Sequence, residues 1–399
     1  MDHDTHSLRH GFFSQLLLSM SISIFSVVLI EVVSGRAQRW LDLWPTYACM
    51  VFNINEPLER MRWIVGDISE VMFYKHELPA LGLFLGAWLA HSAHRHGRRW
   101  QGFAICYGSG LWPWLVTSSM LSLLLSHVLW GWTLRDGTWQ PTYVAFVSLP
   151  AVLVLLFGRG WRVAITGAVL GAVLVTSASL LLVNHLCYPL ELPLVIGNLG
   201  GMAVASAFGF LLCKHIPWMT AGSRLPSGAI TLGPCTEAVS SFGVIWTLRR
   251  VLADFSEPLF LGNEIASLGL LLGVLIAYIL SPASPAYGSH LLLEIISGQA
   301  LASLLGIVLW RQQWKRHGWY PTYLPLVSIV PAAVMSLGGQ WQVIALSAGL
   351  GALVAPPLAV AINLRLPDAM PVFVGNGLAM MLATLVIVPV VGQLTGNSG

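Results

Sequence analysis

The chain has 399 residues, of which 56% are hydrophobic and 9% are charged, and its formal net charge is +3. A soluble domain usually carries about 25% charged residues, so this composition excludes a soluble enzyme, a disordered chain and a nucleic-acid-binding protein. The apolar runs far exceed the roughly 10 residues of a transmembrane β-strand, and they predict an all-α polytopic membrane protein.

The first predicted helix covers about residues 12–34. This apolar run is longer than the central region of a signal peptide, and no small-residue cleavage site follows it. We therefore expect a retained transmembrane helix, and we assign residues 1–59 to this helix and an external segment.

Two parts of the chain repeat each other, and this repeat is the most informative feature of the sequence. The tetrapeptide Asp67–Glu70 recurs 187 residues later as Asp254–Glu257, and the offset then falls to 180, where Pro-Thr-Tyr at 141–143 recurs at 321–323. Because the matches include acidic residues, apolar composition alone does not explain them. The sequence thus predicts two copies of one ancestral half.

Each copy contains five apolar segments. In the first copy, residues 60–214, they cover about 70–91, 107–132, 141–157, 163–184 and 193–213. In the second copy, residues 247–399, they cover about 257–280, 287–310, 321–337, 341–363 and 371–392. Most reach the roughly 20 residues that a membrane span needs, whereas 141–157 and 321–337 are short and are expected to extend into loops or run re-entrant. With the N-terminal helix, the total is about 11 transmembrane helices.

An odd number of spans per copy predicts that the two copies insert with opposite orientation. Equivalent loops carry opposite charge bias, as the positive-inside rule then requires. After the first segment, residues 94–99 are basic in the first copy, whereas residues 281–285 are uncharged in the second. After the second segment, the basic residues are in the second copy, at 311–317. We therefore expect an inverted repeat, the arrangement of many secondary transporters.

The connection between the copies, residues 215–246, is predicted to be a cytoplasmic or re-entrant linker. If residues 229–246 spanned the membrane instead, the copies would be parallel and the charge pattern would have no explanation. In the inverted arrangement, the N-terminus lies inside and the C-terminus outside.

Acidic residues in the apolar segments are the first candidate site residues, because an ionisable group in lipid costs at least about 2.5–3.5 kcal/mol. Glu77 and Glu264 occupy equivalent positions, seven residues into their segments. They could bind a proton, Na⁺ or a cationic group of a substrate. The alternative is an interfacial acid paired with a basic neighbour such as Lys75 or His76.

Asp67, Glu70, Asp254 and Glu257 form the repeated acidic motif. An acid followed three residues later by Glu is typical of a helix N-cap, and duplication alone would copy a cap twice. A direct role in binding is the second interpretation. Both hold if a capped half-helix lines a cavity.

His127 and Glu294 have no polar counterpart in the other copy, where Ile307 and Trp114 stand. Polar residues in the middle of a span break the symmetry of the repeat and could provide specificity. His127 could relay protons, and a neutral, hydrogen-bonded histidine is the alternative.

Asn198 and Asn376 each follow a glycine in the last segment of their copy. Glycine loosens a helix, and the Asn amide offers donors and an acceptor. Paired interruptions of this kind point to a transporter site between the repeats. Close helix packing, with each Asn bonded to a neighbouring helix, is the equal alternative.

Motifs of soluble catalysis, nucleotide binding and zinc binding are missing from the sequence, and no metal or cofactor is expected. We predict a secondary active transporter in the plasma membrane, the inner membrane of a bacterium, that moves a small polar solute coupled to H⁺ or Na⁺ by alternating access. The alternatives are an intramembrane enzyme acting on a lipid-linked substrate and a non-transporting assembly partner. The expected partners are the lipid bilayer, the solute and the ion, with no nucleic acid, and assembly into a homo-oligomer is left open.

Overall fold

Each predicted apolar segment of the two copies is helical in the structure, a computed structural model that describes residues 44–220, 243–367 and 370–396. Within those residues the chain contains no β-strand. The predicted helix at 12–34 and residues 221–242 of the predicted linker lie outside the described residues. The count of about 11 transmembrane helices therefore stays a prediction.

The first copy is preceded by α2 (Tyr47–Phe52) and begins with α3 (Pro57–Glu70). Its other helices are α4 (Glu77–Arg95), α5 (Trp112–Trp130), α6 (Leu149–Phe157), α7 (Trp161–Leu170), α8 (Thr176–Leu182), α9 (Leu194–Cys213) and α10 (Pro217–Thr220). The π-helical turns η4 (Gly171–Val175) and η5 (Val183–Cys187) join α7 to α8 and extend α8, so these pieces form one long helix.

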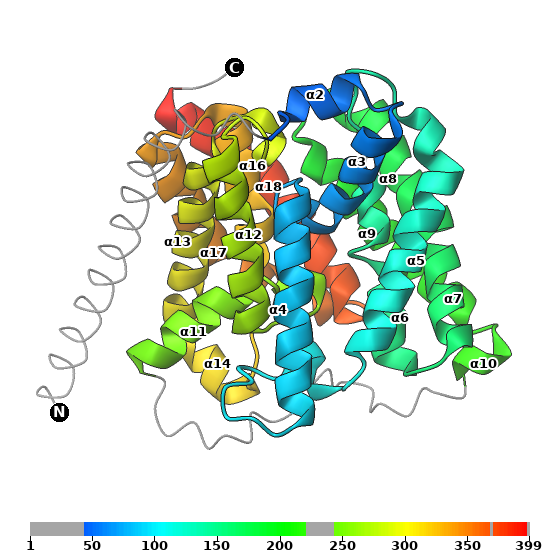
Figure 1. Ribbon diagram of the computed structural model, residues 1–399. Helices are drawn as coiled ribbons and strands as arrows, with labels where there is room; N and C mark the ends of the chain where they lie inside the picture. The colour runs from blue at the N-terminus through cyan, green and yellow to red at the C-terminus, as the bar shows by residue number, and fades with distance from the viewer. Residues whose placement is uncertain (1–43, 221–242, 368–369, 397–399) are drawn as a thin grey trace, which may run out of the picture.

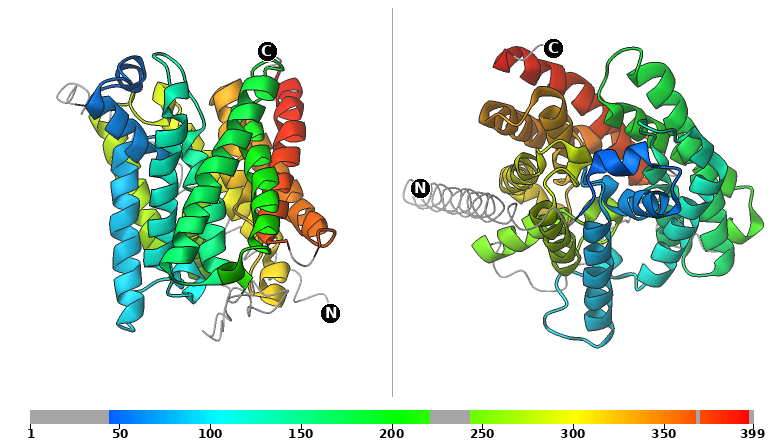
Figure 2. Two further views of the ribbon diagram at one scale, coloured as in Figure 1. Left: turned by 90° about the vertical axis from the view of Figure 1, so that its right-hand side faces the viewer. Right: turned by 45° about the horizontal axis from the view of Figure 1, so that its top comes forward.

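The second copy follows the same order. Its helices are α11 (Val244–Asp254), α12 (Glu264–Leu280), α13 (Leu292–Leu309), α14 (Arg311–His317), α15 (Leu324–Val327), α16 (Ile329–Leu337), α17 (Trp341–Asn363) and α18 (Val372–Thr395). Helix α11 corresponds to α3, and α12 and α13 correspond to α4 and α5. Viewed from the end that carries α2, most helices of the two copies lie on opposite sides of the molecule (Figure 2).

The short third segments are broken helices in both copies. In the first copy a 3₁₀ turn, η3 (Thr142–Ala145), precedes α6, and in the second copy α15 and α16 are separated at Ser328. Ser328 has φ −127° and ψ −62°, outside the helical region. The breaks explain why neither apolar run reaches the length of a full span.

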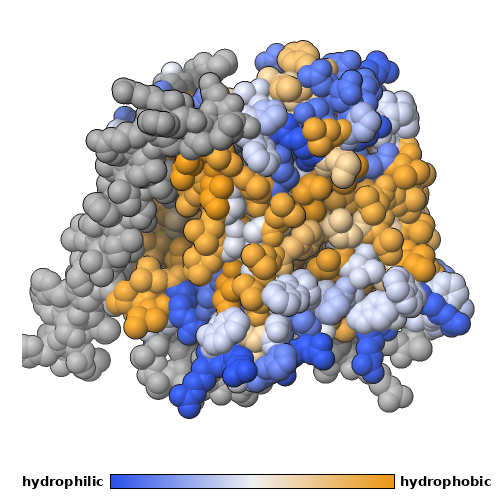
Figure 3. Space-filling view, in the orientation of Figure 1, coloured by the Kyte–Doolittle hydropathy of each residue, from blue (hydrophilic) through white to orange (hydrophobic). Residues whose placement is uncertain are grey.

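The described helices form a bundle that is embedded in a membrane. Among the described residues, six helical stretches are long and apolar enough to cross a bilayer: Trp112–Thr133, Trp161–Cys187, Leu194–Cys213, Leu292–Leu309, Trp341–Asn363 and Val372–Thr395. Large apolar side chains such as Leu85, Val128 and Val386 are exposed. On the visible face, apolar residues form a band across the middle, and hydrophilic residues lie toward both ends (Figure 3). Such a band matches the lipid core between two polar surfaces.

The two copies meet where α4 packs on α12 and where α9 packs on α18. Helices α4 and α12 cross at Gly82 and Gly269, where a Cβ built on either glycine would lie 2.1 or 2.0 Å from the carbonyl oxygen of the other. On one side of this crossing Gly86 faces Ile265, and on the other side Leu78 faces Gly273. The contact order shows that α4 and α12 run antiparallel (Figure 1), and glycine is required because the two backbones touch.

Candidate functional site

The first copy holds a buried cluster of two carboxylates and one ammonium group at the end of α3. Lys75 Nζ donates to Asp67 Oδ1 and to Glu70 Oε2, the latter at 2.6 Å, and all three side chains are 0% exposed. Lys75 lies in the turn after α3 with φ +42°, and this turn brings its side chain back over the helix. Its Nζ lies 3.8 Å from the centre of the Trp63 ring, a cation–π contact.

The second oxygen of Asp67 bonds side chains from two other helical segments of the first copy. Asp67 Oδ2 accepts a hydrogen bond from Thr142 Oγ1 at 2.7 Å, and it lies 2.8 Å from His127 Nε2. The structure therefore brings His127 into the cluster, as a partner of Asp67.

Glu70 connects the first cluster to the second copy. Its Oε1 accepts a hydrogen bond from Trp139 Nε1 at 2.5 Å and another from Tyr287 Oη at 3.2 Å. Tyr287 belongs to the second copy, so this carboxylate lies at the boundary between the halves.

The second copy holds a matching cluster around Arg250. Arg250 Nη2 donates to Asp254 Oδ1 and to Glu257 Oε2, both at 2.6 Å. Asp254 Oδ2 accepts from Ser303 Oγ at 2.6 Å and from Thr322 Oγ1 at 3.1 Å. The Asp254 and Glu257 side chains are 0% and 1% exposed, so this cluster is also buried.

Glu257 repeats the connections of Glu70 with the copies exchanged. Its Oε1 accepts from Trp319 Nε1 at 3.1 Å, and Tyr107 of the first copy lines the same small cavity beside it. Trp319 and Tyr107 stand 180 residues from Trp139 and Tyr287. Each glutamate therefore bonds an indole from its own half and lies beside a tyrosine from the other half.

The cation of each cluster comes from a different position in the repeat. Lys75 corresponds to Gly262 in the second copy, and Arg250 corresponds to Trp63 in the first, both at the offset of 187. Trp63 thus precedes Asp67 by the same four residues that separate Arg250 from its aspartate. Two replacements at separate positions preserve one cation per acid pair, so the charge balance of the clusters is the feature they share.

The acidic motif is not a helix cap, contrary to one interpretation of the sequence. Asp67 and Glu70 lie in the last turn of α3, and Asp254 is the last residue of α11. Glu257 begins only the 3₁₀ turn η6 (Glu257–Leu259). Their carboxylates bond Lys75 and Arg250, which a pattern read along the chain does not reveal.

Glu77 and Glu264 lie outside the clusters and each pairs with an arginine. Glu77 Oε1 accepts from Arg62 Nε at 2.7 Å, and Glu264 Oε1 accepts from Arg249 Nε at 2.8 Å. Both glutamates are the first residues of their helices, α4 and α12, so the expected depth of seven residues is wrong. Residues after the acidic motif form a turn instead of continuing the helix. Of the suggested basic neighbours, His76 lies 3.5 Å from Glu77 Oε2, whereas Lys75 bonds the cluster.

Asn198 and Asn376 do not interrupt their helices. They lie within the continuous helices α9 and α18, so the prediction of paired breaks is wrong. Asn198 Nδ2 donates to Tyr143 Oη at 3.0 Å, and Asn376 Nδ2 donates to Tyr323 Oη at 3.3 Å. The alternative interpretation, an Asn bonded to a neighbouring segment, describes these contacts.

Glu294 is the third residue of α13 and lies beside Gly339. The expected position in the middle of a span is wrong, because α13 begins only at Leu292. The structure does not bring Glu294 into either cluster.

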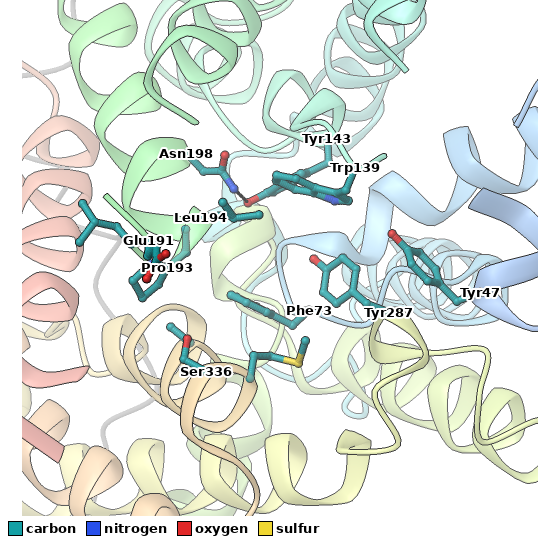
Figure 4. Close-up of a pocket in the computed structure, with 14 residues that line it drawn as sticks. Tyr47, Phe73, Trp139, Tyr143, Glu191, Pro193, Leu194, Asn198, Tyr287 and Ser336 are labelled. Atoms are coloured by element: carbon teal, nitrogen blue, oxygen red, sulfur yellow. Dashed lines mark hydrogen bonds between the residues drawn. The ribbon is translucent and has the colours of Figure 1, made fainter. Parts of the chain in front are cut away.

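Two cavities of unequal size lie beside the clusters, between the copies. The larger, of about 380 Å³, is lined by Tyr47, Phe73, Trp139, Tyr143, Glu191, Leu192, Pro193, Leu194, Val195, Asn198, Tyr287, Ala332, Met335 and Ser336 (Figure 4). The smaller, of about 40 Å³, is lined by residues that include Tyr107, Phe260, Tyr323 and Glu257. Phe73, Tyr143 and Tyr287 of the larger cavity are the repeat equivalents of Phe260, Tyr323 and Tyr107. Tyr143 and Val195 line both cavities, which therefore adjoin.

Charge counting shows what the clusters can do chemically. Each contains two carboxylates and one lysine or arginine, so full ionisation leaves one negative charge without a fixed cation. A buried net charge is costly, and a proton or a bound cation removes it. In the described part of the chain, no group of three or more His, Cys, Asp or Glu side chains is arranged to hold a metal ion.

Comparison with known proteins supplies no functional assignment. No protein-family model and no curated protein sequence matches the chain. The function is therefore inferred from the two clusters and the two cavities.

Proposed function

We propose that the chain is a secondary active transporter, built as an inverted repeat, that moves a small polar solute across the plasma membrane by alternating access. The membrane would be the inner membrane in a bacterium, and the coupling ion H⁺ or Na⁺. The observation that carries this proposal is the buried acid–cation cluster in each half, next to a cavity between the halves. Intramembrane acids that are shared by two repeats are typical of ion-coupled transporters.

Reciprocal contacts between the copies support the inverted arrangement. Cys106 N donates to Leu261 O at 3.0 Å, and the equivalent Ala286 N donates to Tyr74 O at 2.9 Å. Pairs of contacts that exchange the two partners are the mark of a twofold relation. Because α4 and α12 cross antiparallel at equivalent glycines, the twofold axis would run across the helices, in the plane of the membrane.

The ends of the two copies also fit this topology. Helix α10 follows the first copy, at the start of the linker, and α11 opens the second copy; both lie at the end of the molecule that carries α14 (Figure 1). A linker that starts and finishes on one side of the membrane keeps the copies inverted, with the predicted total of 11 spans.

The unequal cavities fit a transporter that is open toward one side. Phe73, Tyr143 and Tyr287 of the larger cavity have their repeat equivalents in the smaller one, yet one cavity has about 380 Å³ and the other about 40 Å³. If the two halves exchanged conformations, the first cavity would close and the second would open. That exchange is the alternating access expected of inverted repeats.

The duplication of the clusters favours a transporter over an intramembrane enzyme. An enzyme acting on a lipid-linked substrate needs one set of acids near one membrane face. Here each half contributes its own acids, and each glutamate lies beside a tyrosine of the other half. An assembly partner that does not transport would need neither the net charge nor the cavities.

Charge displacement in proteoliposomes tests the proposal without knowledge of the substrate. Purified protein on a solid-supported membrane is exposed to a Na⁺ jump or a pH jump, and the transient current is recorded. The wild type should give a current with at least one of the two ions, because the ion binds inside the membrane. Glu70→Gln and Glu257→Gln should reduce it at least about tenfold, whereas Glu56→Gln, at an exposed position, should not. No current with either ion, or unchanged currents in both cluster variants, would refute the proposal.

A further inference from the structure

We propose that the larger cavity binds an organic cation, an alkylammonium group that carries a hydrogen-bond donor. This inference rests on the proposed function, since it names the substrate class of the site between the halves. It follows from the walls of the cavity, from the charges around it and from one polar atom without a partner.

The walls of the cavity are unusually aromatic. Tyr47, Phe73, Trp139, Tyr143 and Tyr287 line it, and they come from both copies (Figure 4). Tyr287 packs edge-on against Tyr47 and Phe73, with ring centroids 5.7 and 6.3 Å away. Aromatic faces carry negative potential, and rings gathered around one space form the cage that binds ammonium groups.

The charges around the cavity are negative. Glu191 is the charged residue among those that line it, and no lysine, arginine or histidine of the described chain does so. Behind the wall, Glu70 accepts hydrogen bonds from Trp139 and Tyr287. A carboxylate bonded to a phenol or an indole increases the electron density of that ring, so two of the five rings attract a cation more strongly. The balancing Lys75 is held away from the cavity, beside Trp63.

One polar group of the cavity wall has an unused acceptor. Asn198 is 3% exposed, and its Nδ2 donates to Tyr143 Oη. Its Oδ1 has no hydrogen-bond partner among the described residues. A buried acceptor left without a donor is costly. This oxygen has less than 1 Å² of exposed surface, so the amide would have to turn toward the cavity for a hydroxyl or N–H group of the ligand to satisfy it. A volume of about 380 Å³ lies in the range of small-molecule sites.

The smaller cavity offers a matching place on the other side. Glu257 lines it directly, together with Tyr107, Tyr323, Phe260 and Phe373. A cation that leaves the larger cavity when the halves exchange conformations would therefore meet aromatic rings and a carboxylate again. The same chemistry along the whole path is what transport of a cation requires.

Binding of radiolabelled choline to the purified protein, measured by scintillation proximity, tests this inference. Choline has an alkylammonium head and a hydroxyl group. Its neutral isostere, 3,3-dimethylbutan-1-ol, has the same shape without the charge. We expect saturable choline binding, competition by tetraethylammonium, and at least about tenfold weaker competition by the neutral alcohol, since a desolvated cation–π contact contributes that much or more.

Variants localise the site with matched controls from the other half. Tyr287→Leu and Phe73→Leu should each weaken choline binding about tenfold, whereas Tyr287→Phe should keep most of it. The equivalent variants Tyr107→Leu and Phe260→Leu should bind nearly as the wild type in this conformation. Size-exclusion profiles check that each variant is folded. If Tyr287→Leu is not monodisperse, Phe73→Leu alone tests the contribution of the aromatic wall.

The two proposals can fail separately. No saturable binding of either cation, equal competition by the neutral alcohol, or unchanged affinity in both Leu variants would overturn the organic-cation site. If the ion-jump current is present in that case, transport stands with another substrate. If choline binds while neither ion gives a current, the site stands and coupled transport falls.

Discussion

Replacing Lys75 with Met removes the ammonium group of the first cluster and keeps a side chain of similar length. Asp67 and Glu70 are then left without their fixed cation in a fully buried site. Removing one partner of a buried ion pair usually costs about 3–5 kcal/mol. At about 1–2 °C per kcal/mol for a chain of this length, the melting temperature in detergent should fall by at least about 3 °C.

The repeat supplies the rescue. Gly262 and Arg250 occupy the positions of Lys75 and Trp63 in the second copy, so the double variant Lys75→Gly with Trp63→Arg rebuilds the second cluster within the first. Arg at 63 would reach Asp67 four residues on, as Arg250 reaches its aspartate. Glycine at 75 suits the positive φ of that position.

Thermal unfolding in one detergent, followed by fluorescence-detected size exclusion, compares the variants. The double variant should regain at least half of the decrease in melting temperature that Lys75→Gly alone causes. Trp63→Arg alone should lose stability, because it places a second cation beside Lys75 and removes the indole donor to Thr142. If the double variant melts no higher than Lys75→Gly, the two clusters are not interchangeable and the reasoning from charge balance is wrong.

Two further predictions follow from the contacts. Gly82→Ala should lower the melting temperature by several degrees, because its Cβ would lie 2.1 Å from a backbone oxygen of α12. Gly349→Ala in α17, where a Cβ meets nothing within 4 Å, should be neutral or stabilising. Equal effects of the two variants would exclude the close crossing of α4 and α12. Arg62→Met should destabilise the protein by at least about 1 kcal/mol more than Arg249→Met, since removing a buried partner costs more than removing an exposed one. The side chains of Arg62 and Arg249 are 10% and 40% exposed. Chemical or thermal unfolding measures this difference, and the reverse order of stability would contradict the prediction.

The positions of the apolar segments could be predicted from the sequence because helices that contact lipid consist mostly of hydrophobic residues. The starts of α4 and α12 could not be predicted, because in the sequence residues 71–76 and their equivalents in the second copy form part of the apolar segment. Phe73 and Lys75 adopt positive φ there, and the chain turns before the helix begins. Glu77 and Glu264 therefore lie at the first positions of their helices.

The acids of the site were identified from the repeat, whereas the lysine and the arginine that pair with them were not. Lys75 against Gly262 and Trp63 against Arg250 are simple mismatches in a residue-by-residue comparison of the copies. Their compensation becomes visible only when the turn after α3 places Lys75 on the acids. Tyr107 and Tyr287 do match between the copies, but contacts across the two halves have no local signal in the sequence.

The most direct test of the inverted arrangement is the sidedness of single cysteines in the loops that follow the second segment of each copy. In a background with Cys49→Ser and Cys235→Ser, Asp136→Cys and Gln312→Cys, both at exposed positions, are labelled with a membrane-impermeant maleimide in intact cells and in inverted vesicles. We expect the two positions to be labelled from opposite sides, with Arg98→Cys on the side of Gln312→Cys. Labelling of Asp136→Cys and Gln312→Cys from the same side would contradict the inverted repeat and the transporter proposed from it.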